Sequence, residues 1–185
     1  MNRYVFLYAA MGLLITGLYS QPLVRPLGTY LGYWGLMGLY WVLISLIGAH
    51  FHWRWNHPAS DGRGRFLLEY ALAVLSADLL FRLTRTVLQD GWLGWGLGGF
   101  AGALALGRLF GLVFRDAPDT WAAALRLGLW GGAGMLLAWT LAEGPIWLKL
   151  PIPHGVHEYG LRPLAAIGAG ALLGRGIGRL YESRS

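Results

Sequence analysis

The segment WLGWGLGGFAGALALGRLFGLVF, which covers residues 92–114, decides the fold class of this chain. It is a continuous apolar run that contains a single charged side chain, Arg108. A helix needs about 20 mostly apolar residues to cross the roughly 30 Å hydrocarbon core of a bilayer. A lipid-facing barrel strand would instead alternate polar and apolar residues. The segment therefore predicts a membrane-spanning helix.

Five more segments share this length and character, and they cover residues 4–20, 30–50, 66–87, 120–142 and 161–180. The connections over residues 52–65 and 143–160 are longer and contain prolines and turn-forming residues. No fixed-period repeat divides the sequence. We expect an all-α, polytopic integral membrane protein whose six transmembrane helices form one bundle, as a single domain over residues 1–185.

The composition supports this class and excludes others. Of the 185 residues, 56% are hydrophobic and 13% are charged, about half the charged share of a soluble domain. The chain has no Cys, which excludes disulfides, thiolate zinc sites, iron–sulfur clusters and thiol catalysis. The net charge is +6. In so apolar a chain, that charge favours anionic lipid headgroups as partners over nucleic acid.

Arginine and lysine are distributed unevenly over the expected connections. With the N-terminus inside, ten cations lie on or near the cytoplasmic face and five on the outer face. The first set is Arg3, Arg54, Arg63, Arg65, Arg108, Arg115, Arg126, Arg175, Arg179 and Arg184; the second is Arg25, Arg82, Arg85, Lys149 and Arg162. Cytoplasmic loops carry an excess of Lys and Arg. We therefore expect a multi-pass protein of the cytoplasmic (inner) membrane with both termini in the cytoplasm.

Glycines recur at every fourth position in two of the expected helices. They are Gly94, Gly98 and Gly102 in one, and Gly170, Gly174 and Gly178 in the other. Small residues at this spacing let two helix backbones approach closely inside lipid. We expect the fourth and sixth helices to pack on one another through these glycines. A homodimer formed through the same glycine-rich helices is the alternative.

Ionisable residues inside an expected span are the main candidates for function, because they are costly in a bilayer. Asp78, Arg82 and Arg85 fall on one face of the helix over 66–87. Asp78 and Arg82 are spaced i, i+4 with the acid first, the favourable order. Glu143 ends the next-but-one helix on the same outer side, where we expect its carboxylate to meet Arg82 or Arg85. The sequence predicts a ligand- or partner-binding pocket here, and a purely structural ion pair is the alternative.

The histidines form two groups. His50, His52 and His57 lie in the segment HFHWRWNH, residues 50–57, whose cations and aromatic rings suit a membrane interface. His154 and His157 belong to the outer connection, and we count them among the candidate ligand- or partner-binding residues. Their His-x-x-His-Glu order differs from the HExxH arrangement that places two ligands and a base on one helical face. We therefore expect no metal ion, and no other cofactor, at either group.

A catalytic constellation is missing from the sequence. Ser45 and Ser76 are the best intramembrane hydroxyls, and neither has a histidine placed as its base at the same depth. A small lipid-modifying enzyme would need such a pair or a metal cluster. The residues favour a non-enzymatic protein.

Two short segments resemble a known family. The motifs are Asp78-Leu79-Leu80-Phe81-Arg82 and Thr140-Leu141-Ala142-Glu143-Gly144-Pro145, and they resemble KbaA, the KinB-signalling pathway activation family of spore-forming Firmicutes. The order of six spans and the register of the opening segment are also similar. The resemblance implies a non-enzymatic membrane protein that promotes a membrane histidine kinase in sporulation signalling.

The competing hypothesis is a solute-binding membrane subunit of an energy-coupling-factor-type vitamin transporter. Such subunits are similar in size and span number, and they bind a small solute from outside beneath their outer loops. The polar outer residues and the long connection over 143–160 suit that role. A bound vitamin or a bound kinase in the purified protein would distinguish the two.

Overall fold

The computed structural model describes residues 3–19, 24–56, 62–89, 91–113 and 120–182. Their regular elements are all helical, and no strand occurs among them, which confirms the all-α expectation for this part of the chain. Six long helices carry the fold: α1 (Arg3–Tyr19), α2 (Val24–Trp55), α3 (Arg63–Val87), α4 (Trp92–Val113), α5 (Trp121–Ala142) and α8 (Arg162–Glu182). Three single turns lie between α5 and α8: α6 (Gly144–Trp147), α7 (His154–Val156) and the π-helical η1 (His157–Leu161).

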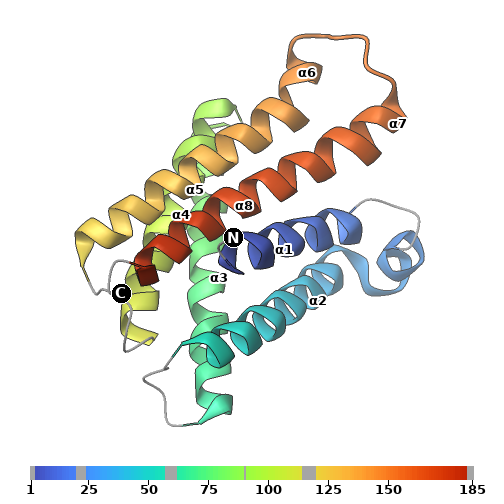
Figure 1. Ribbon diagram of the computed structural model, residues 1–185. Coiled ribbons are helices and arrows are strands. Elements are labelled where there is room, and N and C mark those ends of the chain that lie inside the picture. The colour runs from blue at the N-terminus through green and yellow to red at the C-terminus, as the bar shows by residue number, and fades with distance from the viewer. Residues whose placement is uncertain (1–2, 20–23, 57–61, 90, 114–119, 183–185) are drawn as a thin grey trace.

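The long helices pack on one another in a closed order (Figure 1). Helix α3 packs on α4, α4 on α5, α5 on α8, and α8 on α1. Helix α2 completes the ring between α1 and α3, with sparser contacts than the other neighbours make. Each long helix therefore has one face inside the bundle and another face turned outward.

Both ends of the described chain lie at the same end of the bundle, which we call the terminal end (Figure 1). The rings of Tyr4 and Tyr181 stack with their centroids 5.3 Å apart. The Arg3 guanidinium donates a hydrogen bond of 3.2 Å to the carbonyl of Trp55, at the end of α2. The opposite end, where α5 finishes and α8 begins, is called the distal end below.

Local sequence explains the start and finish of α5. The Thr120 hydroxyl accepts a hydrogen bond of 3.1 Å from the backbone N–H of Ala123, a standard N-terminal cap. The helix stops at Ala142, and Pro145 then stands in the first turn of α6. Proline is favoured at a helix start and cannot continue the preceding helix. These signals place Glu143 at the distal end.

The first glycine series lies on the face of α4 that packs against α3. A Cβ on Gly98 would stand 2.9 Å from the carbonyl oxygen of Phe81, and one on Gly102 would stand 2.6 Å from that of Ala77. A Cβ on Gly94 would lie 3.5 Å from the carbonyl oxygen of Arg85, which is an ordinary van der Waals contact. These glycines of α4 therefore pack against α3, the helix that precedes α4 in the sequence.

The second series lies on the face of α8 that packs against α1. A Cβ on Gly170 would overlap the carbonyl of Tyr8, one on Gly174 would overlap that of Tyr4, and Gly178 is buried further along α8. The expected pairing of the fourth helix with the sixth is therefore wrong, because α5 packs against both and separates them. The spacing of the glycines identifies the helix face that allows close approach, but it does not identify the helix that packs against that face.

Two of the described helices are long and apolar enough to cross a membrane, namely α4 over Trp92–Phe110 and α5 over Trp121–Ala142. Large apolar side chains are also exposed along the outward faces of the other long helices. Examples are Phe6 on α1, Val42 and Leu46 on α2, Leu68, Leu72, Leu75, Leu79 and Leu83 on α3, and Leu164 on α8. Large exposed apolar patches are rare on soluble monomers, and where they occur they mark contact with lipid or protein.

Helix α2 is longer than the sequence suggested. It reaches Trp55, whereas the expected span ended at residue 50 and a loop began at residue 52. The backbone departs from helical geometry at Gly32, where φ is +65°, a value that glycine adopts at little cost. The extra turns at the end of α2 carry His52 and Asn56 into the terminal end of the bundle.

Candidate functional site

Asp78 and Arg82 form an ion pair on α3, as their spacing predicted. The Arg82 Nε donates a hydrogen bond to the Asp78 carboxylate. The pair is partly buried, since the Asp78 and Arg82 side chains are 19% and 41% exposed. Leu75, Leu79 and Leu83 of the same helix are exposed. A partly buried charged pair therefore lies beside exposed apolar side chains.

Arg85 lies one turn further along α3 and contacts aromatic rings. Its guanidinium carbon is 4.7 Å from the ring centre of Trp95 on α4 and 5.6 Å from that of Phe81. The two rings also meet edge to face. Cation–π contacts of this kind stabilise a guanidinium next to apolar surface. They place Arg85 at the junction of α3 and α4.

Glu143 is not brought to Arg82 or Arg85. Its carboxylate lies 3.9 Å from the guanidinium of Arg162, at the start of α8. Arg162 makes a closer ion pair, 2.6 Å, with Glu158 one turn earlier. The expected meeting of Glu143 with the α3 arginines is wrong, because α4 lies between α3 and α5 and turns the end of α5 toward α8.

The two outer histidines are in different surroundings. His157 is buried, and its Nε2 donates a hydrogen bond to the backbone carbonyl of Ala142, tying η1 to the last turn of α5. His154 is exposed three residues earlier. The described residues contain no group of three or more His, Asp or Glu side chains close enough to hold a metal ion. Of the candidate residues expected on the outer side, His157 is therefore buried and structural and His154 is exposed. Glu143 belongs to an ion-pair cluster with Arg162 and Glu158.

A second polar cluster, which sequence reasoning missed, lies buried at the terminal end. We call it the His52 cluster, and it consists of Tyr4, Tyr8, His52, Asn56 and Tyr70. His52 is 0% exposed, so it does not lie in an interfacial belt as expected. Its ring stands among aromatic rings from four helices, those of Tyr4, Tyr8, Tyr70, Phe110 and Tyr181.

The hydrogen bonds of this cluster have a definite direction. The Asn56 side-chain nitrogen donates a hydrogen bond of 3.2 Å to the backbone carbonyl oxygen of His52. Because a carbonyl oxygen only accepts, this contact identifies which Asn56 amide atom is the nitrogen. The same nitrogen lies 3.3 Å from His52 Nδ1, so Nδ1 is the acceptor and the ring proton sits on Nε2. The Tyr4 hydroxyl donates 2.7 Å to the Asn56 amide oxygen.

The chain continues from His52 toward α3. His52 Nε2 is 3.1 Å from the Tyr8 hydroxyl, which accepts from it. Tyr8 can then donate its own proton to the Tyr70 hydroxyl, 3.2 Å away. The chain of hydrogen bonds from Tyr4 to Tyr70 therefore links α1, α2 and α3. Along it, each group donates to the next in the direction of Tyr70.

The hydrogen bonds also settle the charge of the His52 ring. The Asn56 nitrogen can only donate, so His52 Nδ1 carries no proton. A neutral ring with one N–H and one acceptor nitrogen is the form that the hydrogen bonds require. The geometry therefore selects one tautomer.

A spacing pattern in the sequence indicates this cluster. Tyr4 and Tyr8 are spaced i, i+4, as are His52 and Asn56, so each pair shares one helix face. The expected loop over residues 52–65 hides this signal, because helical spacing has no meaning in a loop. The aromatic segment continues the helix instead.

No protein-family model matches this sequence, and neither a curated protein nor a solved structure matches it.

Proposed function

We propose that this chain is a multi-pass protein of the cytoplasmic membrane with six spanning helices and both termini in the cytoplasm. Two helices meet the length and composition of a membrane span, and the outward faces of the other long helices carry exposed leucines. The stacking of Tyr4 on Tyr181 supports an even number of crossings, since it brings both chain ends together. The excess of arginine at this end favours the cytoplasmic side.

The orientation is tested by cysteine labelling, since the chain has no Cys of its own. One variant places Cys at Ser60, outside the described residues in the connection after α2, and another replaces Gly155 with Cys near α7. An impermeant thiol reagent added to intact cells should label only the Gly155 variant. Labelling of the Ser60 variant from outside would reverse the orientation.

We further propose that the protein is a non-enzymatic regulator that promotes a membrane histidine kinase in sporulation signalling. The observation that carries this proposal is the partly exposed Asp78–Arg82 pair on α3, beside exposed leucines. Charged groups within a membrane helix are costly, and they mark functional positions by default. A polar group on a partner helix in the same bilayer is the kind of ligand that such a pair recognises.

The test is capture of the kinase by crosslinking in membranes of the native host. The double variant Asp78→Val/Arg82→Met removes charge and counter-charge together, so it should fold and yet capture less histidine kinase than the wild type. The matched control is Arg65→Met/Glu69→Leu, which removes an ion pair of the same i, i+4 separation in the same helix near the terminal end. Equal capture by the wild type and the Asp78/Arg82 double variant would contradict the proposal.

The alternative function, a solute-binding subunit of a vitamin transporter, depends on the outer residues. The Glu143–Arg162–Glu158 cluster lies at the distal end, which the proposed orientation turns outward. Mass spectrometry of the protein purified in mild detergent distinguishes the two. A vitamin that copurifies, and that Arg162→Gln releases, would favour the transporter subunit over the kinase regulator.

A further inference from the structure

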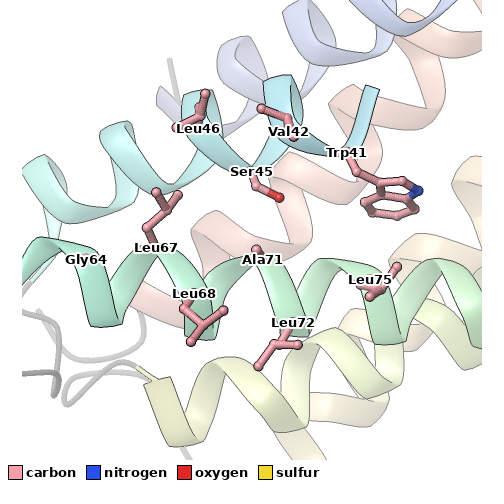
Figure 2. A pocket seen from close by; sticks show the side chains of 10 residues that line it. All are labelled: Trp41, Val42, Ser45, Leu46, Gly64, Leu67, Leu68, Ala71, Leu72 and Leu75. Atoms are coloured by element: carbon pink, nitrogen blue, oxygen red, sulfur yellow. The ribbon is translucent and has the colours of Figure 1, made fainter. Parts of the chain in front are cut away.

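An apolar groove runs along the surface between α2 and α3, with a volume of about 370 Å³ (Figure 2). Val42 and Leu46 line it from α2, and Leu68 and Leu72 line it from α3. All four of these side chains are also exposed on the outward face of the bundle. The groove therefore opens sideways, toward the surroundings of the helices.

The groove exists because small residues occur where large ones would close the gap between the two helices. Ser45 of α2 and Ala71 of α3 face each other at its middle, and the Ser45 hydroxyl points toward α3 (Figure 2). At one end lies Gly64, where an added Cβ would meet no atom within 4 Å. Helix α2 also packs less closely on α3 than α4 does.

The dimensions suit a single hydrocarbon chain. The lining of α3 extends from Gly64 to Leu75, a rise of about 16 Å at 1.5 Å per residue. A helix is about 10–12 Å across, whereas packed carbon atoms stand about 3.5–4.0 Å apart. An extended acyl chain is therefore the thinner occupant, and it suits a long gap between two helix faces.

Positive charge gathers at the Gly64 end of the groove. Gly64 stands between Arg63 and Arg65 in the first turn of α3. Arg65 is held by Glu69 at 2.9 Å, whereas Arg63 is exposed with no acidic residue in that turn. A basic site beside an apolar groove at a cytoplasmic helix end has the form of a site for an anionic lipid headgroup.

We propose that the α2–α3 groove binds one acyl chain of an anionic phospholipid, with the lipid phosphate held at Arg63. The apolar lining takes the chain from Gly64 toward Leu75, and the cation at the terminal end selects the headgroup. This inference rests on the proposed membrane placement and is independent of any kinase partner.

The experiment is native mass spectrometry of the full-length protein, delipidated in detergent and titrated with phosphatidylglycerol or with phosphatidylcholine. The wild type should bind one phosphatidylglycerol in preference to phosphatidylcholine. Arg63→Gln should weaken phosphatidylglycerol binding by about fivefold, the effect of one cation near an anionic headgroup, and should leave phosphatidylcholine binding unchanged. Gly64→Phe and Ala71→Phe should weaken binding of both lipids by filling the groove.

Two control variants separate the groove from general effects of charge and bulk. Arg126→Gln removes another exposed arginine, on α5, and Ala122→Phe adds the same ring at an exposed position in the first turn of α5. Both should bind phosphatidylglycerol as the wild type does. If Gly64→Phe and Ala71→Phe, both folded by their melting temperatures, still bind it at wild-type affinity, the groove proposal is overturned.

Cell fractionation keeps this outcome distinct from a failure of the membrane placement. A chain recovered in the soluble fraction would overturn the placement and the lipid proposal together. A membrane-resident chain that binds the two lipids equally would overturn the lipid proposal alone.

Discussion

The Nε2 atom of His52 lies 3.1 Å from the hydroxyl of Tyr8, and this contact joins α2 to α1 where the two helices otherwise touch sparsely. The Tyr4 hydroxyl makes a second link of 2.7 Å to Asn56, one turn away on both helices. Two buried polar bonds therefore set the register of α1 against α2. In low dielectric such bonds are directional and costly to leave unmade, so they specify one arrangement where apolar contacts do not.

We expect the stability of the protein to fall in mild acid because of His52. Protonation of His52 in the folded state would remove the acceptor nitrogen that Asn56 contacts, whereas the unfolded chain binds a proton below about pH 6.5 without that cost. The stabilising effect of the neutral ring is complete above about pH 6.5 and is lost progressively as the pH falls below that value. The loss is measured as a lower melting temperature in detergent at pH 5 than at pH 7.5.

Two histidine variants test the origin of that pH dependence. His52→Gln should reduce the difference in melting temperature between pH 7.5 and pH 5. His154→Gln, at an exposed position, should leave the difference as it is in the wild type. The explanation fails if both variants keep the full difference.

Asn56→Leu should destabilise the protein by about 1–3 kcal/mol, the cost of removing a buried hydrogen-bonding group. The Tyr4 hydroxyl and His52 Nδ1 each lose the hydrogen bond that they make with Asn56. Tyr70→Phe should cost less, because it removes only the last hydroxyl of the run. Thermal unfolding monitored by circular dichroism compares the two, and a larger loss for Tyr70→Phe would contradict the proposed direction of the hydrogen bonds.

Gly98→Leu and Gly174→Leu should each destabilise the bundle by about 1–3 kcal/mol, as overpacking usually does. Their side chains would meet the backbone of Phe81 and of Tyr4, which cannot move aside as a flexible side chain can. Gly38→Leu is the control, since an added Cβ there meets no atom within 4 Å. The same melting temperature for all three variants would show that Gly98 and Gly174 are not needed for the packing of α4 and α8.

Asp78→Ala should cost more stability than Asp78→Val/Arg82→Met. The single variant removes the carboxylate that accepts the Arg82 hydrogen bond and keeps the partly buried positive charge, whereas the double variant removes charge and counter-charge together. Because Arg82 is 41% exposed, the difference should be about 1–2 kcal/mol, below that of a fully buried pair. Melting temperatures in lipid nanodiscs measure it, and a double variant less stable than the single would contradict the argument.

Arg162→Met should change stability by less than about 1 kcal/mol, although Arg162 contacts two carboxylates. The guanidinium is 41% exposed, Glu143 is 37% exposed and Glu158 is 17% exposed, and ion pairs that remain open to solvent contribute little. The wild type should also lose any contribution of this cluster at high salt. A loss of several kcal/mol in the Arg162 variant would show that the cluster holds η1 and α8 in place.

The sequence by itself determined where the helices lie. Long apolar segments, the Thr120 cap and the glycine–proline pair after Glu143 act locally, so the expected spans coincide closely with α1, α3, α4, α5 and α8. The Asp78–Arg82 pair was also predictable, because both partners belong to one helix and i, i+4 geometry is fixed by the helix itself.

Only the tertiary structure decided which helix faces which. The glycines of α4 and α8 mark close contacts in sequence, but their partners, α3 and α1, follow from the order of helices around the bundle. Glu143 pairs with Arg162 for the same reason. The His52 cluster combines residues from three helices, and its burial exists only once those helices have packed. A periodic pattern sets the direction of a side chain around its own helix, whereas its neighbour depends on every other helix at once.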